Sequence, residues 1–578
     1  MTDYPWPNLA VMFFETAERL SDSPFLWAKQ DGLYQPITWA ETAKKISAVS
    51  EGLTSLGVKP GDRVALISEN RPEWLIADIA IMAIGAITVP AYVTNTEADH
   101  YHILSDSGAV GAVVSTSRLA EKLLPAADKV SDTRFILAID ELDGVATGNM
   151  EIQSWDSCLD AGGTENVREQ AGAWSDQDTA CIIYTSGTGG KPKGVMQSHR
   201  NLFHNVIGAR DALAEMGLGK EVFLSFLPLS HSYEHMAGQF FPISIGAEIY
   251  YAEGIESLGA NMVEARPTIM TAVPRLYETM HQRISQGVRK AGGLKEKMFM
   301  GALELGRKKY ETGNQLGPIE KIKDSILDKL VRDKVRGRFG GRLKALVSGG
   351  APLNPDIGIF FTALGLRLLQ GYGQTETAPV ISVNRPSGPK MHTVGLPMIN
   401  TEVRIADDGE ILTRGDLVMK GYWRNEEATR DVIRDGWVHT GDIGHFDEFG
   451  HLIITDRKKD IIVNSGGDNV APQRVEGLLS LEPEIAQALV FGDKRPHLVA
   501  VVVPDEGWLR DQRTDPHKAL QAVVEEVNTQ LSAVEKVRRF IVADSPFTIE
   551  NEQLTPTMKV RRHVVNDIYG ERLNGLYR

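Results

Sequence analysis

The stretch Tyr184-Thr-Ser-Gly-Thr-Gly-Gly-Lys-Pro-Lys-Gly-Val195 decides the fold of this chain. Residues 179–184 lead into it and are apolar and β-branched, which predicts a short buried strand. Ser198 follows as a suitable N-cap, and a helical pattern continues to about Leu213. The sequence therefore predicts a strand, a loop of glycines, hydroxyls and two lysines, and then a helix. Such a loop lets backbone N–H groups approach an anion closely, which favours the binding of nucleotide phosphates.

The composition indicates a globular protein with two or more domains. A chain of 578 residues is too long for one compact core. Its content of 42% hydrophobic and 24% charged residues is ordinary for a globular protein. The net charge of −14 argues against general binding of nucleic acid. Cys158 and Cys181 provide neither a disulfide framework nor a metal cluster, which fits a reducing cytoplasm. Residues 1–5 show no secretory signal, and the apolar window 74–93 predicts a buried helix and strand rather than a membrane span.

Helical and strand patterns alternate along residues 1–175. Thr38 and Glu41 open an amphipathic helix that extends to about Leu56, and residues 64–68 predict a strand. Alternation of this kind predicts an α/β fold, in which mostly parallel sheets have helices on both faces.

Three further predicted strands lead into polar, glycine-rich segments. Residues 223–228 precede His231, residues 343–348 precede Gly349-Gly350-Ala351, and residues 368–370 precede Gly371-Tyr372-Gly373-Gln-Thr375-Glu376-Thr377. In open α/β sheets, ligands bind beyond the carboxyl ends of the strands, so these segments are expected to line one crevice.

Each of these residues also has a simpler interpretation. A single histidine such as His231 is more often a hydrogen-bonded core residue, and Gly349-Gly350 suits a tight turn. Tyr372 suits packing, and Glu376 suits a charge at a helix cap. The phosphate-binding loop itself, taken alone, suits a mobile surface loop, and its spacing is not that of a Walker motif.

The whole loop resembles the phosphate-loop signature of the AMP-forming adenylate ligases, a superfamily of acyl-CoA synthetases, luciferases and peptide-synthetase adenylation domains. Gly189 departs from the pattern, because the family usually has Thr or Ser there. The resemblance implies that Lys193 is catalytic and that Thr188 also contacts the metal. It further implies that the phosphates bind to Thr185, Ser186, Gly187, Thr188 and Gly190.

The later segments match the same family in order. By that resemblance, Gly349, Gly350, Ala351 and Tyr372 flank the adenine, Gly373 belongs to the same nucleotide site, and Thr375 contacts the α-phosphate. Glu376 would hold Mg²⁺, a metal that prefers carboxylate oxygen and bridges phosphates, and His231 would lie near the acyl carboxylate. Residues 436–442 resemble the ribose motif, which makes Asp442 the candidate to accept the two ribose hydroxyls.

Residues 456–460, Asp-Arg-Lys-Lys-Asp, resemble the hinge between the two domains of the family. Arg457 would contact ribose and Lys459 would be the pivot, with Gly466 and Gly467 in a loop that faces the thiol tunnel in one conformation. Val463 stands where some relatives have a lysine. The implied domains are a large N-terminal domain, 1–457, and a small, mobile α+β domain, 458–578.

The C-terminal domain has patterns of its own. Residues 498–503 predict a strand, and Asp515 to about Val537 predicts a helix. Lys559 lies in a stretch, residues 554–562, that resembles the catalytic-lysine motif of the family. Without that resemblance, a lysine in a basic tail would be expected to be solvent-exposed.

Residues 273–278 and 465–472 narrow the resemblance to long-chain fatty acyl-CoA synthetases. The implied reaction uses ATP and Mg²⁺ to convert a fatty acid to acyl-AMP, and then CoA to form the thioester. Three alternatives stay open: delivery to a carrier protein or other acceptor, activation of another carboxylic acid, or a non-catalytic nucleotide- or acyl-binding protein. The chain length, the pathway and the oligomeric state, with a homodimer as one option, are not determined. Phe240 and Phe241 are candidates for the acyl tunnel and could equally be core.

Residues 275–344 form a predicted basic helical insertion. They hold 18 Lys and Arg against 8 Asp and Glu, a net charge of +10 in a chain whose total is −14. One interpretation is a set of solvated helices. Another is peripheral contact of a cytoplasmic protein with an anionic membrane, and a third is attraction of CoA. The cations that we expect to matter are Lys295, Lys297, Arg307, Lys308 and Lys309.

Overall fold

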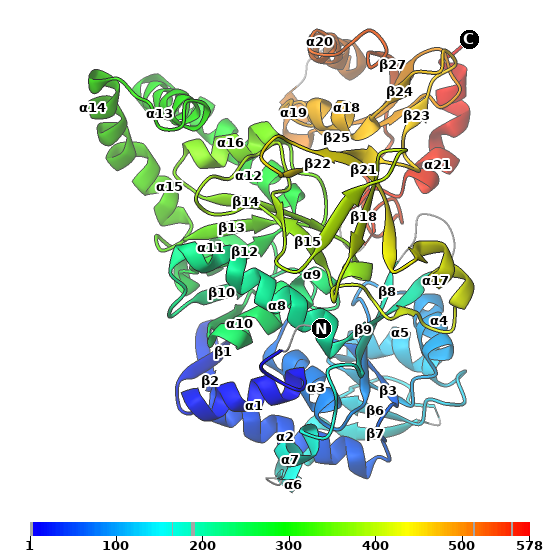
Figure 1. Cartoon of the computed structure of the whole chain (residues 1–578). Helices are drawn as coiled ribbons and strands as arrows, with labels where there is room; N and C mark the ends of the chain where they lie inside the picture. Colours follow the sequence, from blue (N-terminus) through cyan, green and yellow to red (C-terminus); the bar gives the residue numbers. More distant parts are fainter. Residues whose placement is uncertain (1–3, 149, 164–165, 186–190, 512–514, 556–558) are drawn as a thin grey trace.

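The computed structural model describes residues 4–148, 150–163, 166–185, 191–511, 515–555 and 559–578. The larger, N-terminal part contains two mainly parallel sheets with helices between and around them, and a smaller domain is placed against it (Figure 1). This is the predicted α/β class with a second, α+β domain.

The first sheet contains the phosphate-loop strand near one end. The strands lie in the order β19 (Gly421–Tyr422), β9 (Lys193–Ser198), β8 (Thr179–Thr185), β4 (Ile87–Pro90), β3 (Arg63–Ile67), β5 (Gly111–Val114), β6 (Phe135–Ala138) and β7 (Glu151–Ser154). From β8 to β7 the neighbours are parallel.

The segment after the phosphate loop corrects one prediction. Lys193–Ser198 is a strand, β9, which pairs antiparallel with β8, so that Thr185 lies opposite Lys193. The loop therefore closes a hairpin that was not predicted. The helix that follows, α8, begins after Ser198 as predicted, and the Ser198 hydroxyl accepts a hydrogen bond from Asn201 N–H as N-cap. Gly194 permits this pairing, because a Cβ there would lie 2.7 Å from Ile182.

The second sheet contributes most of the strand ends at the site. The strands lie in the order β16 (Leu396–Pro397), β15 (Val380–Val383), β14 (Leu368–Gly373), β13 (Ala345–Ser348), β12 (Ile269–Ala272), β10 (Val222–Ser225), β11 (Glu248–Tyr251), β1 (Pro24–Gln30) and β2 (Leu33–Thr38). Strands β10, β12, β13 and β14 are parallel, so their carboxyl ends lie on one edge.

Helices fill the space between the two sheets and cover their outer faces. Successive side chains of a strand alternate between these layers: Phe223 packs into the core between the sheets, whereas Leu224 packs outward. The helices at or near the inner core are α1 (Leu9–Leu20), α2 (Trp39–Ser55), α3 (Pro72–Ala83), α6 (Trp155–Ala161), α7 (Asn166–Ala171), α8 (His199–Leu213), the π-helical turn η2 (His235–Phe240) and α10 (Phe241–Ile245). On the other face of the first sheet lie α4 (Glu97–Ser107) and α5 (Ser117–Ala127).

Local sequence signals at these helices are confirmed. Thr38 and Glu41 form a capping box at the start of α2. The apolar window 74–93 forms α3 and β4, as predicted. Within the described residues, no helix is long and apolar enough to cross a membrane.

The outer face of the second sheet carries the basic insertion. It is covered by α11 (Leu258–Ala265), α12 (Pro274–Ala291), α13 (Gly293–Glu311) and α16 (Pro355–Ala363). The helix predicted over 319–339 is divided into α14 (Pro318–Leu327), a π-helical turn η3 (Asp328–Arg332) and α15 (Asp333–Arg338). Helices α13 and α14 extend away from the body (Figure 1).

A third sheet leads to the small domain. It contains β17 (Glu402–Ile405), β18 (Glu410–Arg414), β21 (Trp437–Phe446) and β20 (Ile433–Arg434), with β22 (Leu452–Arg457) paired to β21, and α17 (Glu426–Val432) beside it. The small domain has β25 (Ile485–Phe491), β26 (Leu498–Pro504) and β27 (Val537–Val542), a hairpin of β23 (Ile462–Val463) and β24 (Asn469–Val470), and the helices α18 (Pro472–Leu479), α19 (Glu506–Asp511), α20 (Pro516–Asn528) and α21 (Arg562–Gly575).

One helix of the small domain is shorter than predicted. The helix expected from Asp515 to about Val537 ends at Asn528, because the Asn528 side chain bonds the backbone of Val537, which begins β27. The division of the chain at residue 457 stays a prediction, although β22 ends at that residue.

Candidate functional site

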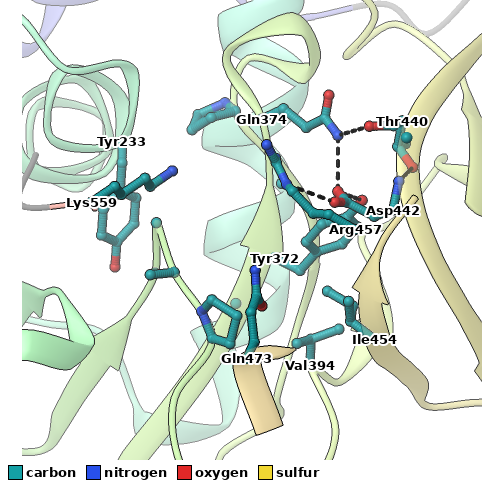
Figure 2. A pocket seen from close by; sticks show the side chains of 18 of the residues that line it. Tyr233, Tyr372, Gln374, Val394, Thr440, Asp442, Ile454, Arg457, Gln473 and Lys559 are labelled. Atoms are coloured by element: carbon teal, nitrogen blue, oxygen red, sulfur yellow. Dashed lines mark hydrogen bonds and ion pairs between the residues drawn. The ribbon is translucent and has the colours of Figure 1, made fainter. Parts of the chain in front are cut away.

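A cavity of ≈ 2150 Å³ lies where the carboxyl ends of β10, β12, β13 and β14 face the small domain. Its lining includes residues of both domains, and Figure 2 shows part of it. Sites for one small molecule usually have about 300–1,000 Å³, so this cavity has room for more than one ligand group.

The carboxylate of Asp442, on β21, organises the polar end of the cavity. It is 3% exposed and accepts hydrogen bonds from the Tyr372 hydroxyl at 2.6 Å and the Gln374 amide at 3.0 Å. Arg457 lies directly opposite on β22 and donates its Nε–H to the other oxygen at 3.0 Å. Three donors from two segments of the chain thus hold one buried charge in place (Figure 2).

The Gly349-Gly350-Ala351 segment follows β13 and forms one wall of the cavity. Gly349 lies against the ring of Tyr233, where a Cβ would come 3.0 Å from Cζ. Tyr233 cannot easily yield, because its hydroxyl donates to the Val347 carbonyl at 2.9 Å. Gly350 has a φ of +82°, which favours glycine.

Gly373, at the end of β14, also lies where the surrounding backbone leaves no room for a side chain. A Cβ at Gly373 would lie 1.8 Å from the carbonyl oxygen of Pro379, so only glycine fits there. Thr375 follows in a short 3-10 turn, where its carbonyl accepts from Gln197 at 2.6 Å and its hydroxyl lies 3.2 Å from that of Ser232.

Glu376 lines the cavity beside Thr375 and is the one predicted metal ligand that the structure describes. The Tyr422 hydroxyl donates to its Oε1 at 2.8 Å, and its Oε2 has no hydrogen-bond partner among the described residues. No group of three or more His, Cys, Asp or Glu side chains in the described part of the chain is arranged to hold a metal. One free carboxylate oxygen suits Mg²⁺, which commonly binds through one or two carboxylates together with substrate phosphates.

Lys193 and Thr185 lie at the base of the phosphate loop, at the paired ends of β9 and β8, and both line the cavity. The Lys193 ammonium lies 5.0 Å from the centre of the Tyr422 ring, which is a cation–π distance. Four predicted residues, Ser186, Gly187, Thr188 and Gly190, lie outside the described residues.

His231 lies at the start of the short turn that carries Tyr233. Its Nδ1 accepts a hydrogen bond from Tyr233 N–H at 3.2 Å, which leaves the proton of the neutral ring on Nε2. Burial among protein atoms and the positive charge of Lys559 lower the pKa of His231 to about 3. The imidazole is therefore neutral at physiological pH and can donate from Nε2.

Lys559 reaches the cavity from the small domain. Its backbone is held by hydrogen bonds in both directions with Thr555. The side chain is exposed to solvent, and it lines the cavity together with residues of the large domain such as Tyr233 and Asp442 (Figure 2). Desolvation, followed by the charge of Arg457, lowers the pKa of Lys559 to about 8, against the opposite effect of Asp442 and Glu376.

The predicted hinge adjoins this polar end. Lys458 donates to Asp408 at 2.6 Å and to Glu410 at 3.2 Å, which fixes it to the large domain. Lys459 lines the cavity and forms no ion pair among the described residues. Gly466 and Gly467 do not line this cavity; they lie in the β23–β24 turn, and Gly466 borders a separate hollow.

The opposite end of the cavity is apolar. It is bordered by Ala209, Leu213, Met236, Ala237, Phe241 and Val383. These residues come from α8, η2, α10 and β15, so this end extends between the two main sheets. Of the two phenylalanines suggested from the sequence, Phe241 lines the cavity, whereas Phe240 is fully buried in the core.

The chain matches the family of AMP-binding enzymes over residues 13–423 and the C-terminal domain of AMP-binding enzymes over residues 459–578. It belongs to this family. A long-chain-fatty-acid–CoA ligase of Mycobacterium bovis is 36% identical to this AMP-binding enzyme, over 99% of this chain and 97% of the relative. A chloroplastic long-chain-fatty-acid–[acyl-carrier-protein] ligase of Arabidopsis thaliana is 30% identical, over 99% of this chain and 87% of the relative.

A solved structure shares the fold. The A domain of a carboxylic acid reductase from Segniliparus rugosus, in complex with AMP and a co-purified carboxylic acid, superposes with a TM-score of 0.78. The match covers 100% of this chain and 95% of the other at 22% identity. At that identity the similarity shows the common architecture of the enzyme and no more.

Several cavity residues of this AMP-binding enzyme were not predicted. Gln374 lies inside the quoted segment 371–377, yet nothing local indicates that its amide reaches Asp442. Tyr422 and Ser232 approach Glu376 and Thr375 from distant positions. A Gly-Tyr-Trp run at 421–423 was the only signal for Tyr422.

The contact between Gly349 and Tyr233 generates a prediction. Gly349→Ala should lower the free energy of unfolding by about 1–3 kcal/mol, because the new methyl group overpacks a ring that cannot retreat. Thermal or denaturant unfolding of the purified variant measures this. Gly259→Ala in α11, where a Cβ meets nothing within 4 Å, is the matched control and should not be destabilised. Equal stability of both variants would contradict the close contact.

Proposed function

We propose that this AMP-binding enzyme activates a long-chain fatty acid with ATP and then transfers the acyl group to CoA. The observation that carries the proposal is a single cavity with a polar, charged end around Asp442 and Lys559 and an apolar end lined by residues such as Phe241 and Met236. A nucleotide and an acyl chain must meet at their reactive ends, and such a cavity can hold both. The 36% identical relative is itself named a long-chain-fatty-acid–CoA ligase.

In the first step, a carboxylate oxygen of the fatty acid attacks the α-phosphorus of ATP. The bond from that phosphorus to pyrophosphate breaks, which yields acyl-AMP. In the second step, the CoA sulfur attacks the acyl carbon, AMP leaves with its phosphate oxygen, and the thiol proton passes to solvent. In both transition states negative charge is concentrated on the oxygens of the reacting phosphate and acyl groups, so oriented donors and cations are the groups that accelerate the two steps.

We assign nucleotide binding to the polar end. Asp442 would accept the ribose hydroxyls, with Arg457 beside it, while Tyr372 and Gln374 hold its carboxylate. The rest of the proposed nucleotide site is the wall and loop residues predicted from the sequence: Gly349, Gly350, Ala351, Gly373, Thr375, Thr185, Ser186, Gly187, Thr188 and Gly190.

Glu376, together with the Thr188 hydroxyl, is the proposed holder of Mg²⁺, which when bound neutralises phosphate charge. Lys193 at the base of the loop would add a second cation near the phosphates. His231, neutral and able to donate from Nε2, would orient the acyl carboxylate.

Lys559 would stabilise the charge that develops on the α-phosphate. It lies across the cavity from Asp442, and its ammonium is protonated below pH 8. Because it belongs to the small domain, its presence at the site depends on how that domain is oriented.

The second step would use another orientation of the small domain. The hydrogen bonds that cross to the large domain include Arg275 to the Ala486 carbonyl at 3.0 Å and Asn354 to the Gly477 carbonyl at 3.3 Å. Hydrogen bonds of this kind, from a side chain to a backbone carbonyl, can break and be replaced by others when the small domain rotates. Rotation about Lys459 would withdraw Lys559 and bring the Gly466–Gly467 turn to the thiol.

A second candidate function is transfer of the acyl group to a carrier protein, which the Arabidopsis relative favours by its name. Pyrophosphate release with palmitate, followed by AMP release on addition of CoA, supports the CoA ligase. Acylation of a carrier protein without any effect of CoA supports the alternative. A cytoplasmic location and a homodimer stay predictions.

Lys559→Ala should slow the formation of acyl-AMP by about 10²–10³-fold, the usual effect of removing one preorganised electrostatic group. Thioester formation from supplied acyl-AMP should change little. ATP–pyrophosphate exchange and single-turnover thiolysis measure the two steps separately. A normal exchange rate in the variant would remove Lys559 from the mechanism.

The pH dependence of adenylation should follow the lowered pKa of Lys559. The ammonium is present below pH 8 and lost above it, so kcat/KM for adenylation should fall as the pH rises through about 8. Lys559→Arg keeps its charge at high pH, and its profile should lack this decline. The same decline in Lys559→Arg would assign the titration to another group.

Lys459→Pro should preserve adenylation and abolish thioester formation. Among the described residues the Lys459 N–H donates no backbone hydrogen bond, so proline removes none from this state, yet it fixes φ against rotation. The two half-reactions are assayed separately, with Lys459→Ala as the control that keeps backbone freedom. Equal loss of both steps would contradict the hinge.

Ala237→Phe should shorten the preferred fatty acid. A phenyl group in the apolar end of the cavity takes the space of several methylenes, so kcat/KM for palmitate should fall about tenfold relative to octanoate. Ala161→Phe, on an exposed helix end outside the cavity, is the matched control. An unchanged ratio in Ala237→Phe would place the acyl chain elsewhere.

A further inference from the structure

The helices of the basic insertion form an arm, defined here as residues 293–338, at the edge of the large domain (Figure 1). The α13 helix packs closely on α16, where a Cβ at Gly306 would lie 2.4 Å from the Ala363 carbonyl oxygen. The α14 helix packs on α13 and continues into η3, with little else beside it. It is therefore the outermost element of the arm.

An apolar stripe runs along the exposed face of α14. Ile319, Ile322 and Ile326 follow the three- and four-residue spacing of one helix face, and they are 71%, 65% and 52% exposed. Leu330 continues the stripe into η3. Single exposed apolar residues are ordinary on protein surfaces, but a row of branched aliphatic side chains on one helix face indicates a surface that another phase or molecule covers.

The acidic residues of this part of the arm are already paired. Glu320 binds Lys308 at 2.6 Å, and Asp324 binds Arg332 at 2.7 Å. Asp328 and Asp333 both bind Arg336. These ion pairs join α13 to α14, α14 to η3, and η3 to α15. Every Asp and Glu of α14, η3 and α15 is paired, whereas Glu296, Glu304 and Glu311 on α13 form no ion pair among the described residues.

Unpaired cations flank the stripe: Lys323 lies one turn from Ile319 and from Ile326, and Lys329 lies one turn from Ile326, whereas Lys321 lies on an adjoining face of α14. Lys321, Lys323 and Lys329 form no ion pair among the described residues, and all three are exposed. This corrects the set of cations expected from the sequence. Three of the five, Arg307, Lys308 and Lys309, are engaged in ion pairs with Asp356, Glu320 and Asp324, whereas Lys295 and Lys297 are unpaired within the described chain.

We propose that the arm docks on an anionic lipid bilayer. Ile319, Ile322 and Ile326 would enter the headgroup region, while Lys321, Lys323 and Lys329 contact lipid phosphates. An aliphatic face flanked by lysines, on a helix that lies on the surface rather than spanning it, is what an anionic membrane interface binds.

Charge favours a bilayer over a second copy of the chain. A symmetric contact between two arms would set the unpaired lysines of one copy against those of the other. The arm also lies in the segment of charge +10, whereas the whole chain carries −14, so this surface is the part of the molecule that an anionic membrane attracts. The proposal does not depend on the ligase reaction, because docking requires neither ATP nor fatty acid.

Co-sedimentation with vesicles tests the proposal, using the full chain without substrates. Vesicles of equal parts phosphatidylglycerol and phosphatidylcholine should bind the protein, and pure phosphatidylcholine vesicles should not. Binding should weaken from about 0.1 M to about 1 M NaCl, as the Debye length falls from about 10 Å to about 3 Å. Absence of binding to the anionic vesicles at about 0.1 M NaCl would overturn the proposal.

The apolar stripe is tested without any change of charge. A triple variant, Ile319→Ser, Ile322→Ser and Ile326→Ser, should bind the anionic vesicles at least about tenfold more weakly. The matched control replaces three residues of similar exposure elsewhere, which are Leu33, Ile255 and Val263 at 67%, 64% and 49%. The control should bind like the wild type, and an equal loss in both would overturn the assignment to the arm.

The lysines are tested in the same manner. Lys321→Gln, Lys323→Gln and Lys329→Gln together should weaken binding about tenfold and flatten its salt dependence. Three exposed lysines outside the arm provide a control with the same change in net charge: Lys44→Gln, Lys122→Gln and Lys220→Gln. Unfolding curves show that each variant is folded.

Two other outcomes would also overturn the proposal. If the stripe variant converts a dimer to a monomer in light scattering while vesicle binding is unchanged, the stripe contacts a second copy. If the lysine variant raises the KM for CoA while vesicle binding is unchanged, the cations serve that substrate.

Discussion

The buried carboxylate of Asp442 is the constraint on which the site depends. An ionised carboxyl group out of water is costly unless strong donors satisfy it, and three donors do so: the Tyr372 hydroxyl, the Gln374 amide and the Arg457 guanidinium. Tyr372 and Gln374 come from the end of β14 and the residue after it, and Arg457 comes from the end of β22, within the predicted hinge segment 456–460. The polar end of the cavity and the segment that leads to the small domain are thus held by one group.

The orientation of the small domain has an electrostatic consequence. Desolvation and the charge of Arg457 disfavour the ammonium form of Lys559. A phosphate bound beside it would offset that cost, and by linkage the ligand would favour this position of Lys559 to the same extent. A ligand that lacks the phosphate gains no such advantage. Under the proposed mechanism, charge at the cleft would couple the chemistry to the position of the small domain.

Basic residues of the arm have two different roles, and whether a residue has an ion-pair partner decides which role it has. Lys308, Arg332 and Arg336 hold the arm together through ion pairs, whereas Lys321 and Lys323 lack such partners and face solvent. A stable arm of this kind can present an apolar stripe to water, because the ion pairs and the packing of α13 on α16, rather than burial of α14, maintain its shape.

The sequence by itself determined the features that depend on neighbours in the chain. The capping signals at Thr38 and Ser198 and the alternation of helices and strands are local, and the motifs of the family rest on short consecutive runs. Only the tertiary structure decided that residues 193–198 form a strand, because a short segment becomes one when β8 offers it hydrogen bonds. It also decided that Gln374 and Tyr422 reach the site, and which lysines of the arm are paired. These depend on distances between residues far apart in the chain, and counts of charge or hydrophobicity contain no such distances.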